Sequence, residues 1–170
     1  VTSSHLLDDI CATLGGRAAE ELIYGEVSTG ALNDLENTTK KAYAMIVYYG
    51  FSDKLKNLSY YDSSGRSDYA FSKPYSEETS KLIDEEVKVL INEQYERAKS
   101  ILSENMDGLR QLASILIEKE VIFAEDVERI FGKRPWMSRA EELNAESEQV
   151  KENSESSVSS ENQENKANDE

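Results

Sequence analysis

Apolar residues in this chain recur at three- and four-residue steps, and no other feature constrains the fold as strongly. On an α-helix, positions with this spacing lie along one face, where they can be buried together. The first such stretch spans residues 4–24 and places on one face Leu7, Ile10, Cys11, Leu14, Ala18 and Leu22. Gly15-Gly16 interrupts the stretch. Because each glycine inside a helix costs about 1 kcal/mol relative to alanine, we expect another backbone to approach closely there.

The helical spacing returns in residues 34–49, 76–104, 106–119 and 124–131. Asn33 is a candidate N-cap with Glu36 three residues on, the pattern of a capping box. Ser76 precedes two glutamates, which is typical of a helix start. Residues 58–61 allow one short strand, and residues 62–68 have the composition of a mobile loop. The pattern therefore predicts an all-α fold, a helical bundle of about four to five helices.

The last 33 residues differ in composition from the rest. Residues 138–170 hold ten carboxylates against Arg139, Lys151 and Lys166, and the remainder is mostly serine, asparagine and glutamine. Such a segment buries too little apolar surface to offset the entropy of ordering. We therefore expect one domain over residues 1–137 and a disordered acidic tail over residues 138–170.

Charge and composition exclude several classes of protein. With 34 acidic and 19 basic residues, the net charge is −15, which argues against nucleic-acid binding because that needs a basic surface. No apolar run approaches the roughly 18 residues of a membrane span, and no signal peptide is visible, so we expect this segment to be soluble. The single cysteine, Cys11, cannot form an internal disulfide, which fits a reducing compartment.

The chain is also poor in catalytic residues. His5 is the only histidine, and its place near a helix start favours a solvated terminal residue. Cys11 lies on the apolar face of the first stretch, which favours buried packing over a role as nucleophile. No His-x₃-His, Cys-x₂-Cys or glycine-rich phosphate loop occurs. By itself the sequence offers no complete catalytic site.

Two blocks stand out: Leu-Gly-Gly-Arg-Ala-Ala-Glu-Glu at residues 14–21 and Ser-Thr-Gly-Ala-Leu-Asn-Asp-Leu at residues 28–35. Together they closely resemble the peptidase domain of the FtsH family of ATP-dependent, membrane-anchored zinc metalloproteases. The similarity continues through Tyr-Tyr-Gly-Phe-Ser at residues 48–52 and Ile-Asp-Glu-Glu-Val at residues 83–87, and it covers about residues 5–132. The resemblance implies that residues 1–137 form the helical part of such a domain.

The resemblance implies a zinc ligand at Asp34. In this family two histidines of a His-Glu-x-x-His helix hold the zinc together with the second residue of the Asn-Asp pair, which is Asp34 here. A carboxylate in the first turn of a helix is stabilised as an anion, and a metal ligand must be ionised. The alternative is that Asp34 merely favours the helix N-terminus, as acidic first turns commonly do.

The first glutamate of the Glu-Glu pair, Glu20, falls near the metal in the same comparison. There it could orient a ligating histidine. The alternative is an ordinary helix carboxylate paired with Arg17, three residues earlier. Thr29 and Gly30 would bring backbone close to the site, with Gly30 supplying unusual torsion angles.

The departure from the family pattern is large. The His-Glu-x-x-His helix, the ATPase module and the membrane anchor lie outside this sequence, so we expect no catalytic residue in the chain and no activity of the chain alone. In the parent protein the resemblance implies zinc, ATP, protein substrates, a homo-hexamer and a place at the cytoplasmic face of the inner membrane. The alternative function is a stand-alone, non-catalytic helical interaction module.

Overall fold

The computed structural model describes residues 1–61 and 73–135, and within these ranges the chain is all-α, as predicted. The predicted loop at residues 62–68, the domain end at residue 137 and the acidic tail lie wholly or partly outside these residues. The described residues form six α-helices and one 3₁₀ turn: α1 (Ser3–Thr13), α2 (Gly15–Tyr24), η1 (Thr29–Ala31), α3 (Leu32–Val47), α4 (Glu77–Glu104), α5 (Met106–Lys119) and α6 (Ala124–Phe131). No strand forms in the described residues, and the short strand allowed at residues 58–61 is therefore not formed.

The first predicted helix is two helices. Leu14 ends α1 and donates its N–H to the Ile10 carbonyl (3.0 Å) before α2 begins at Gly15. The expected reason for the glycine pair is wrong, because a Cβ built on Gly15 or Gly16 would meet no atom within 4 Å. The pair coincides with the break between the helices, where low helix propensity is tolerated. Gly25 ends α2 in the left-handed conformation (φ 72°), as its position past the last apolar residue predicts.

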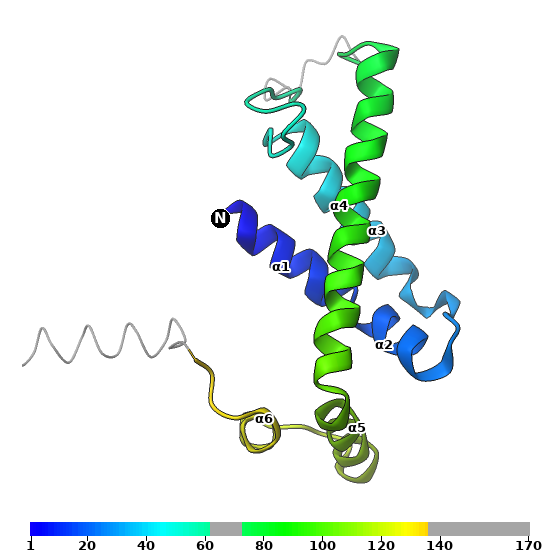
Figure 1. Cartoon of the computed structure of the whole chain (residues 1–170), viewed down its shortest axis with the longest axis vertical. Coiled ribbons are helices and arrows are strands. Elements are labelled where there is room, and N and C mark those ends of the chain that lie inside the picture. Colours follow the sequence, from blue (N-terminus) through cyan, green and yellow to red (C-terminus); the bar gives the residue numbers. More distant parts are fainter. Residues whose placement is uncertain (62–72, 136–170) are drawn as a thin grey trace, which may run out of the picture. The chain divides into compact units, whose positions relative to one another are not determined.

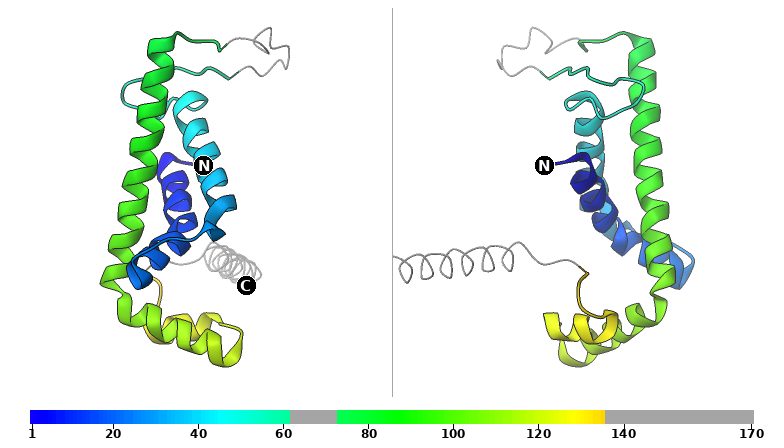
Figure 2. Two further views of the ribbon diagram at one scale, coloured as in Figure 1. Left: turned by 90° about the vertical axis from the view of Figure 1, so that its right-hand side faces the viewer. Right: turned by 60° about the vertical axis from the view of Figure 1, so that its left-hand side comes forward.

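The chain divides within α5 into two compact units, Val1–Arg110 and Gln111–Glu170. In the first unit α4 is the longest helix, and α1, α2 and α3 all pack against it (Figure 1). The two turned views in Figure 2 show the same arrangement, with α1 and α3 on one side of α4. Ser76 caps α4 by accepting the Thr79 N–H (3.2 Å), which confirms the predicted helix start.

The core of the first unit lies where α1 and α3 meet α4. Ile10 and Leu14 pack against Ala42 and Met45, and partly buried side chains of α4 close this cluster. A second cluster joins the end of α3 to the following loop and to Ile83. Tyr49, the last residue of the helix predicted over 34–49, is 58% exposed because α3 ends two residues earlier, at Val47.

The loop after α3 turns sharply at Gly50, whose φ is 63°. Tyr60 returns along the loop and donates its N–H to the Val47 carbonyl (2.8 Å). The buried Ser52 hydroxyl accepts the N–H groups of Lys54 and Leu55 and donates to Glu86 of α4 (2.8 Å). These hydrogen bonds fix the loop against α4.

In the second unit, α6 begins with a reciprocal cap. The Asp126 carboxylate accepts the Phe123 N–H (3.3 Å) and pairs with Arg129 (2.6 Å), and these contacts lower the pKa of Asp126. Ala113 and Leu116, apolar residues of the helix predicted over 106–119, are exposed, and no residue of α5 is fully buried. Across the described ranges of both units, no helix has the length and apolarity that crossing a membrane requires.

Candidate functional site

Asp34 lies in the first turn of α3, as predicted. The side chain is partly buried, and the Asp34 carbonyl accepts the Thr38 hydroxyl (2.9 Å) within the helix. Within residues 1–61 and 73–135, no hydrogen bond or ion pair reaches the Asp34 carboxylate. The first turn of a helix presents unpaired N–H groups and the positive end of the helix dipole, which stabilise an anion. Asp34 therefore offers a carboxylate without a hydrogen-bond or ion-pair partner among the described residues.

The capping box predicted at Asn33 and Glu36 is wrong. The helix begins two residues earlier than predicted, at Leu32, and the N-cap residue Ala31 makes no side-chain cap. The reason is that η1 leads directly into α3, so Asn33 is already helical. Glu36 instead forms an ion pair with Lys40 one turn further on, and this pairing lowers the pKa of Glu36.

Glu20 projects from α2 to Ser28, in the loop that precedes η1. Its carboxylate accepts both the Ser28 hydroxyl (2.6 Å) and the Ser28 N–H (3.1 Å), and these hydrogen bonds lower the pKa of Glu20. The alternative, an ion pair between Glu20 and Arg17, does not form in the described residues, although the Arg17 charge contributes to the lowered pKa of Glu20. Arg17 instead donates from Nη1 to the Ser28 carbonyl (3.3 Å). Both α2 side chains therefore contact the same residue, a link that helical spacing alone does not reveal.

The expectation that Gly30 supplies unusual backbone torsion angles is wrong. It lies within η1, and its φ is not among the positive values of the described glycines. Its N–H donates to the Ser28 hydroxyl (3.2 Å), and a Cβ at this position would approach that oxygen to 3.3 Å. Glycine therefore keeps room for the Ser28 hydroxyl rather than supplying a special backbone shape.

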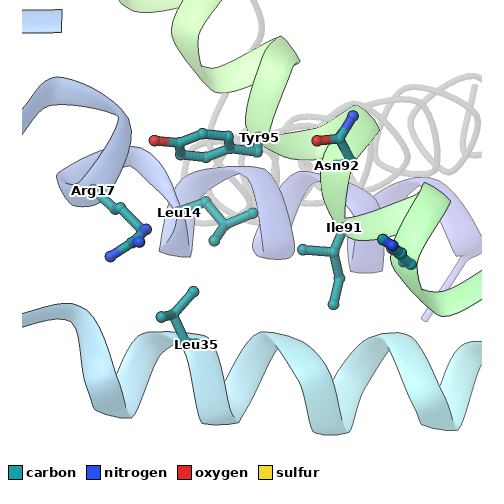
Figure 3. Close-up of a pocket in the computed structure, with 7 residues that line it drawn as sticks. Leu14, Arg17, Leu35, Ile91, Asn92 and Tyr95 are labelled. Atoms are coloured by element: carbon teal, nitrogen blue, oxygen red, sulfur yellow. The ribbon is translucent and has the colours of Figure 1, made fainter. Parts of the chain in front are cut away.

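A cavity of about 310 Å³ opens beside these residues, between α2, α3 and α4. Figure 3 shows Leu14 and Leu35 pointing toward each other across it, with Ile91 and Tyr95 contributed by α4. Arg17 also lines the cavity. Leu35, which lines the cavity, directly follows Asp34 in the chain. The cavity walls are mainly apolar.

The structure supports the non-catalytic interpretations of Cys11 and His5. Cys11 is buried in the first unit, and burial raises the pKa of the Cys11 thiol, which makes the reactive thiolate scarce near neutral pH. His5 is exposed in the first turn of α1, where its backbone N–H donates to the Thr2 hydroxyl (3.4 Å). Neither residue lies in a cluster of reactive groups.

The donors present fit one ligand position of a zinc site and no more. In the part of the chain that the structure describes, no three histidine, cysteine, aspartate or glutamate side chains lie close enough to hold a metal ion. A catalytic zinc needs three protein ligands, so Asp34 would need two partners from elsewhere. The described residues thus contain one candidate metal ligand and no complete metal centre.

Comparison with known proteins agrees with this description. Residues 1–130 match the sequence profile of peptidase family M41. The ATP-dependent zinc metalloprotease FtsH of Parabacteroides distasonis is 65% identical over 142 residues, 84% of this chain and 21% of that protein. The FtsH of Karelsulcia muelleri is 53% identical over 74% of this chain and 20% of that protein. The mitochondrial ATP-dependent zinc metalloprotease FTSH 10 of Arabidopsis thaliana is 45% identical over 81% of this chain and 16% of that protein.

The chain belongs to peptidase family M41. It spans about a fifth of the length of the curated bacterial relatives it matches, and it corresponds to part of their peptidase domain. The resemblance found in the two sequence blocks is therefore confirmed at the level of the family.

Proposed function

We propose that this chain is a segment of an ATP-dependent zinc metalloendopeptidase and that it supplies Asp34 as one of three zinc ligands. The observation that carries the proposal is the carboxylate of Asp34, partly buried at a helix start and without a partner in the described residues. The family match supports it, because the relatives named above are zinc metalloproteases. When bound, the zinc would polarise the substrate carbonyl and activate a water.

The rest of the catalytic site would come from sequence beyond these 170 residues. The chain has one histidine, His5, and no His-Glu-x-x-His motif, so both histidine ligands and the glutamate that activates water must lie elsewhere. Within the parent, this chain would provide the Asp34 ligand, the helices that support it, and Glu20 as a residue near the metal. Alone, the chain would neither bind zinc at micromolar affinity nor cleave casein.

The remaining family properties are part of the same proposal. The parent would carry an ATPase module and a membrane anchor, assemble as a homo-hexamer, degrade proteins and lie at the cytoplasmic face of the inner membrane. The peptidase part would end near residue 137, and residues 138–170 would form an acidic extension that solvates the end of the chain.

The proposal is tested by Asp34→Ala in the full-length protease. We expect this variant to lose bound zinc and casein degradation while ATP hydrolysis continues, because only the metal site loses a ligand. The matched control is Glu36→Gln, an exposed carboxylate in the same helix that pairs with Lys40. It should retain zinc and activity.

Two results would contradict the proposal. If Asp34→Ala digests casein at the normal rate with zinc bound, Asp34 is not a ligand. If the gene encodes no His-Glu-x-x-His motif and the 170-residue chain is made on its own, the chain is an interaction module and not part of a protease.

A further inference from the structure

Every polar group of Ser28 forms a hydrogen bond. Its N–H and hydroxyl donate to the two oxygens of Glu20, at 3.1 and 2.6 Å. Its carbonyl accepts from Arg17 (3.3 Å), and its hydroxyl oxygen also accepts the Gly30 N–H (3.2 Å). A loop residue with four such hydrogen bonds has little freedom to move, because they restrain its N–H, its carbonyl and its hydroxyl together.

Both anchors come from one face of α2. Arg17 and Glu20 are three residues apart, so their side chains project from the same side of the helix. Arg17 is partly buried and lines the cavity with Leu14 and Leu35, which restrains its long side chain. Glu20 is an anion, and hydrogen bonds to an ionised acceptor are stronger than those between neutral groups. The pair therefore forms a preorganised holder for Ser28.

The start of α3 follows this holder closely in the chain. η1 runs directly into α3, and the N-cap residue Ala31 provides no side-chain cap. Ser28 caps η1, and thus supplies a side-chain hydrogen bond ahead of the turn that carries Asp34. Asp34 follows Ser28 by only six residues.

We propose that Arg17, Glu20 and Ser28 form a clamp that positions the Asp34 turn for metal binding. This inference rests on the proposed role of Asp34. Glu20 and Arg17 are positioning residues: they act on Asp34 through Ser28, and Glu20 does not need to contact a ligating histidine to affect the metal. Gly30 contributes to the clamp because a side chain at this position would crowd the Ser28 hydroxyl.

The clamp itself is tested in the 170-residue chain by amide hydrogen exchange. Glu20→Ala should speed exchange at the Ser28 amide, and Ser28→Ala at the Gly30 amide, on the order of tenfold for each lost hydrogen bond. The matched control is Glu26→Ala, an exposed carboxylate in the same connection, which should change neither amide. If the Ser28 amide exchanges equally fast in Glu20→Ala and in the unaltered chain, the clamp does not exist.

The effect on the metal is tested in the full-length protease by zinc affinity, measured by competition with a chelator. Glu20→Ala and Ser28→Ala should each weaken zinc binding about 10–100-fold, the usual effect of losing a residue that supports a metal ligand. The double variant should be no weaker than the worse single variant, because both break the same link. Ser28→Thr keeps the hydroxyl and should retain the affinity, as should Glu26→Ala.

Three results separate the explanations. If Glu20→Ala weakens zinc binding while Ser28→Ala does not, Glu20 acts on the metal ligands directly and the clamp is overturned. If Asp34→Ala loses zinc while both clamp variants keep full affinity, the clamp has no role in metal binding, although the proposed function stands. If Asp34→Ala keeps zinc, the proposed function fails and the clamp as a metal-positioning device fails with it, whatever the exchange data show. Unchanged circular dichroism of the variants excludes general unfolding as the cause.

Discussion

Gly50 is the residue whose replacement tests the fold most sharply. It is buried at the turn after α3, and its φ of 63° lies in the left-handed region. A Cβ built on Gly50 would lie 2.7 Å from the Leu58 carbonyl oxygen and 3.2 Å from the backbone nitrogens of Asn57 and Leu58. All three atoms belong to the backbone, so a small side-chain movement cannot relieve the contact.

Two effects add in Gly50→Ala. The left-handed conformation costs a residue with a Cβ about 1–2 kcal/mol. Forcing a carbon against fixed backbone resembles overpacking of a core, which costs about 1–3 kcal/mol. We therefore expect the free energy of unfolding to fall by about 2–5 kcal/mol, a large part of the 5–15 kcal/mol that is usual for a folded domain.

Gly25→Ala is the matched control. Gly25 has a similar φ of 72°, but a Cβ there would meet nothing within 4 Å. It should therefore lose only the conformational part, about 1–2 kcal/mol. The difference between the two variants isolates the backbone contact at Gly50.

The assay is urea denaturation of the 170-residue chain, followed by far-ultraviolet circular dichroism. The midpoint should fall in both variants, and further in Gly50→Ala, with little change in the denaturant slope. If the two variants lose the same stability, the close approach of residues 57 and 58 to Gly50 is wrong.

Two further predictions use the same chain. Ile10→Ala should lower the free energy of unfolding by about 2–5 kcal/mol because Ile10 is fully buried. Leu32 is 75% exposed, so Leu32→Ala should change the free energy of unfolding by less than about 0.5 kcal/mol in the same urea assay. Equal losses in the two variants would contradict the placement of the core. Burial and the hydrogen bond with Tyr75 raise the pKa of Tyr43 to about 12, so the neutral phenol is favoured in the folded state. The resulting stabilisation is complete below about pH 10 and is lost as the pH rises toward 12. The difference in tyrosinate absorbance between the unaltered chain and Tyr43→Phe should therefore titrate near pH 12, and titration near pH 10 would contradict the partly buried, hydrogen-bonded pair.

Helix content was predictable from the sequence because apolar spacing and capping residues are local signals. Ser76 and Gly25 mark helix ends where the structure has them. The break between α1 and α2 at Leu14 was harder to predict, because the apolar spacing continues through both helices although the helical backbone is interrupted there. The spacing extended the helix to Tyr49, but α3 ends at Val47 and Tyr49 is exposed.

The candidate site was predictable only in part. Asp34 occupies the expected first turn, but the residue that links Glu20 to that turn, Ser28, lies eight positions beyond Glu20 in a loop. Helical spacing predicts contacts three or four residues apart, and so the local partner that it offered for Glu20 was Arg17. The contact with Ser28 depends on how the loop folds back on α2, which is a tertiary feature.

The most direct measurement is the distance between the Asp34 carboxylate and zinc in an experimental structure of the full-length protease. We predict that one carboxylate oxygen lies about 2.0–2.2 Å from the metal, with two histidine nitrogens from another part of the protein completing the ligand set. A structure in which Asp34 lies beyond bonding distance and a different residue supplies the third ligand would contradict it.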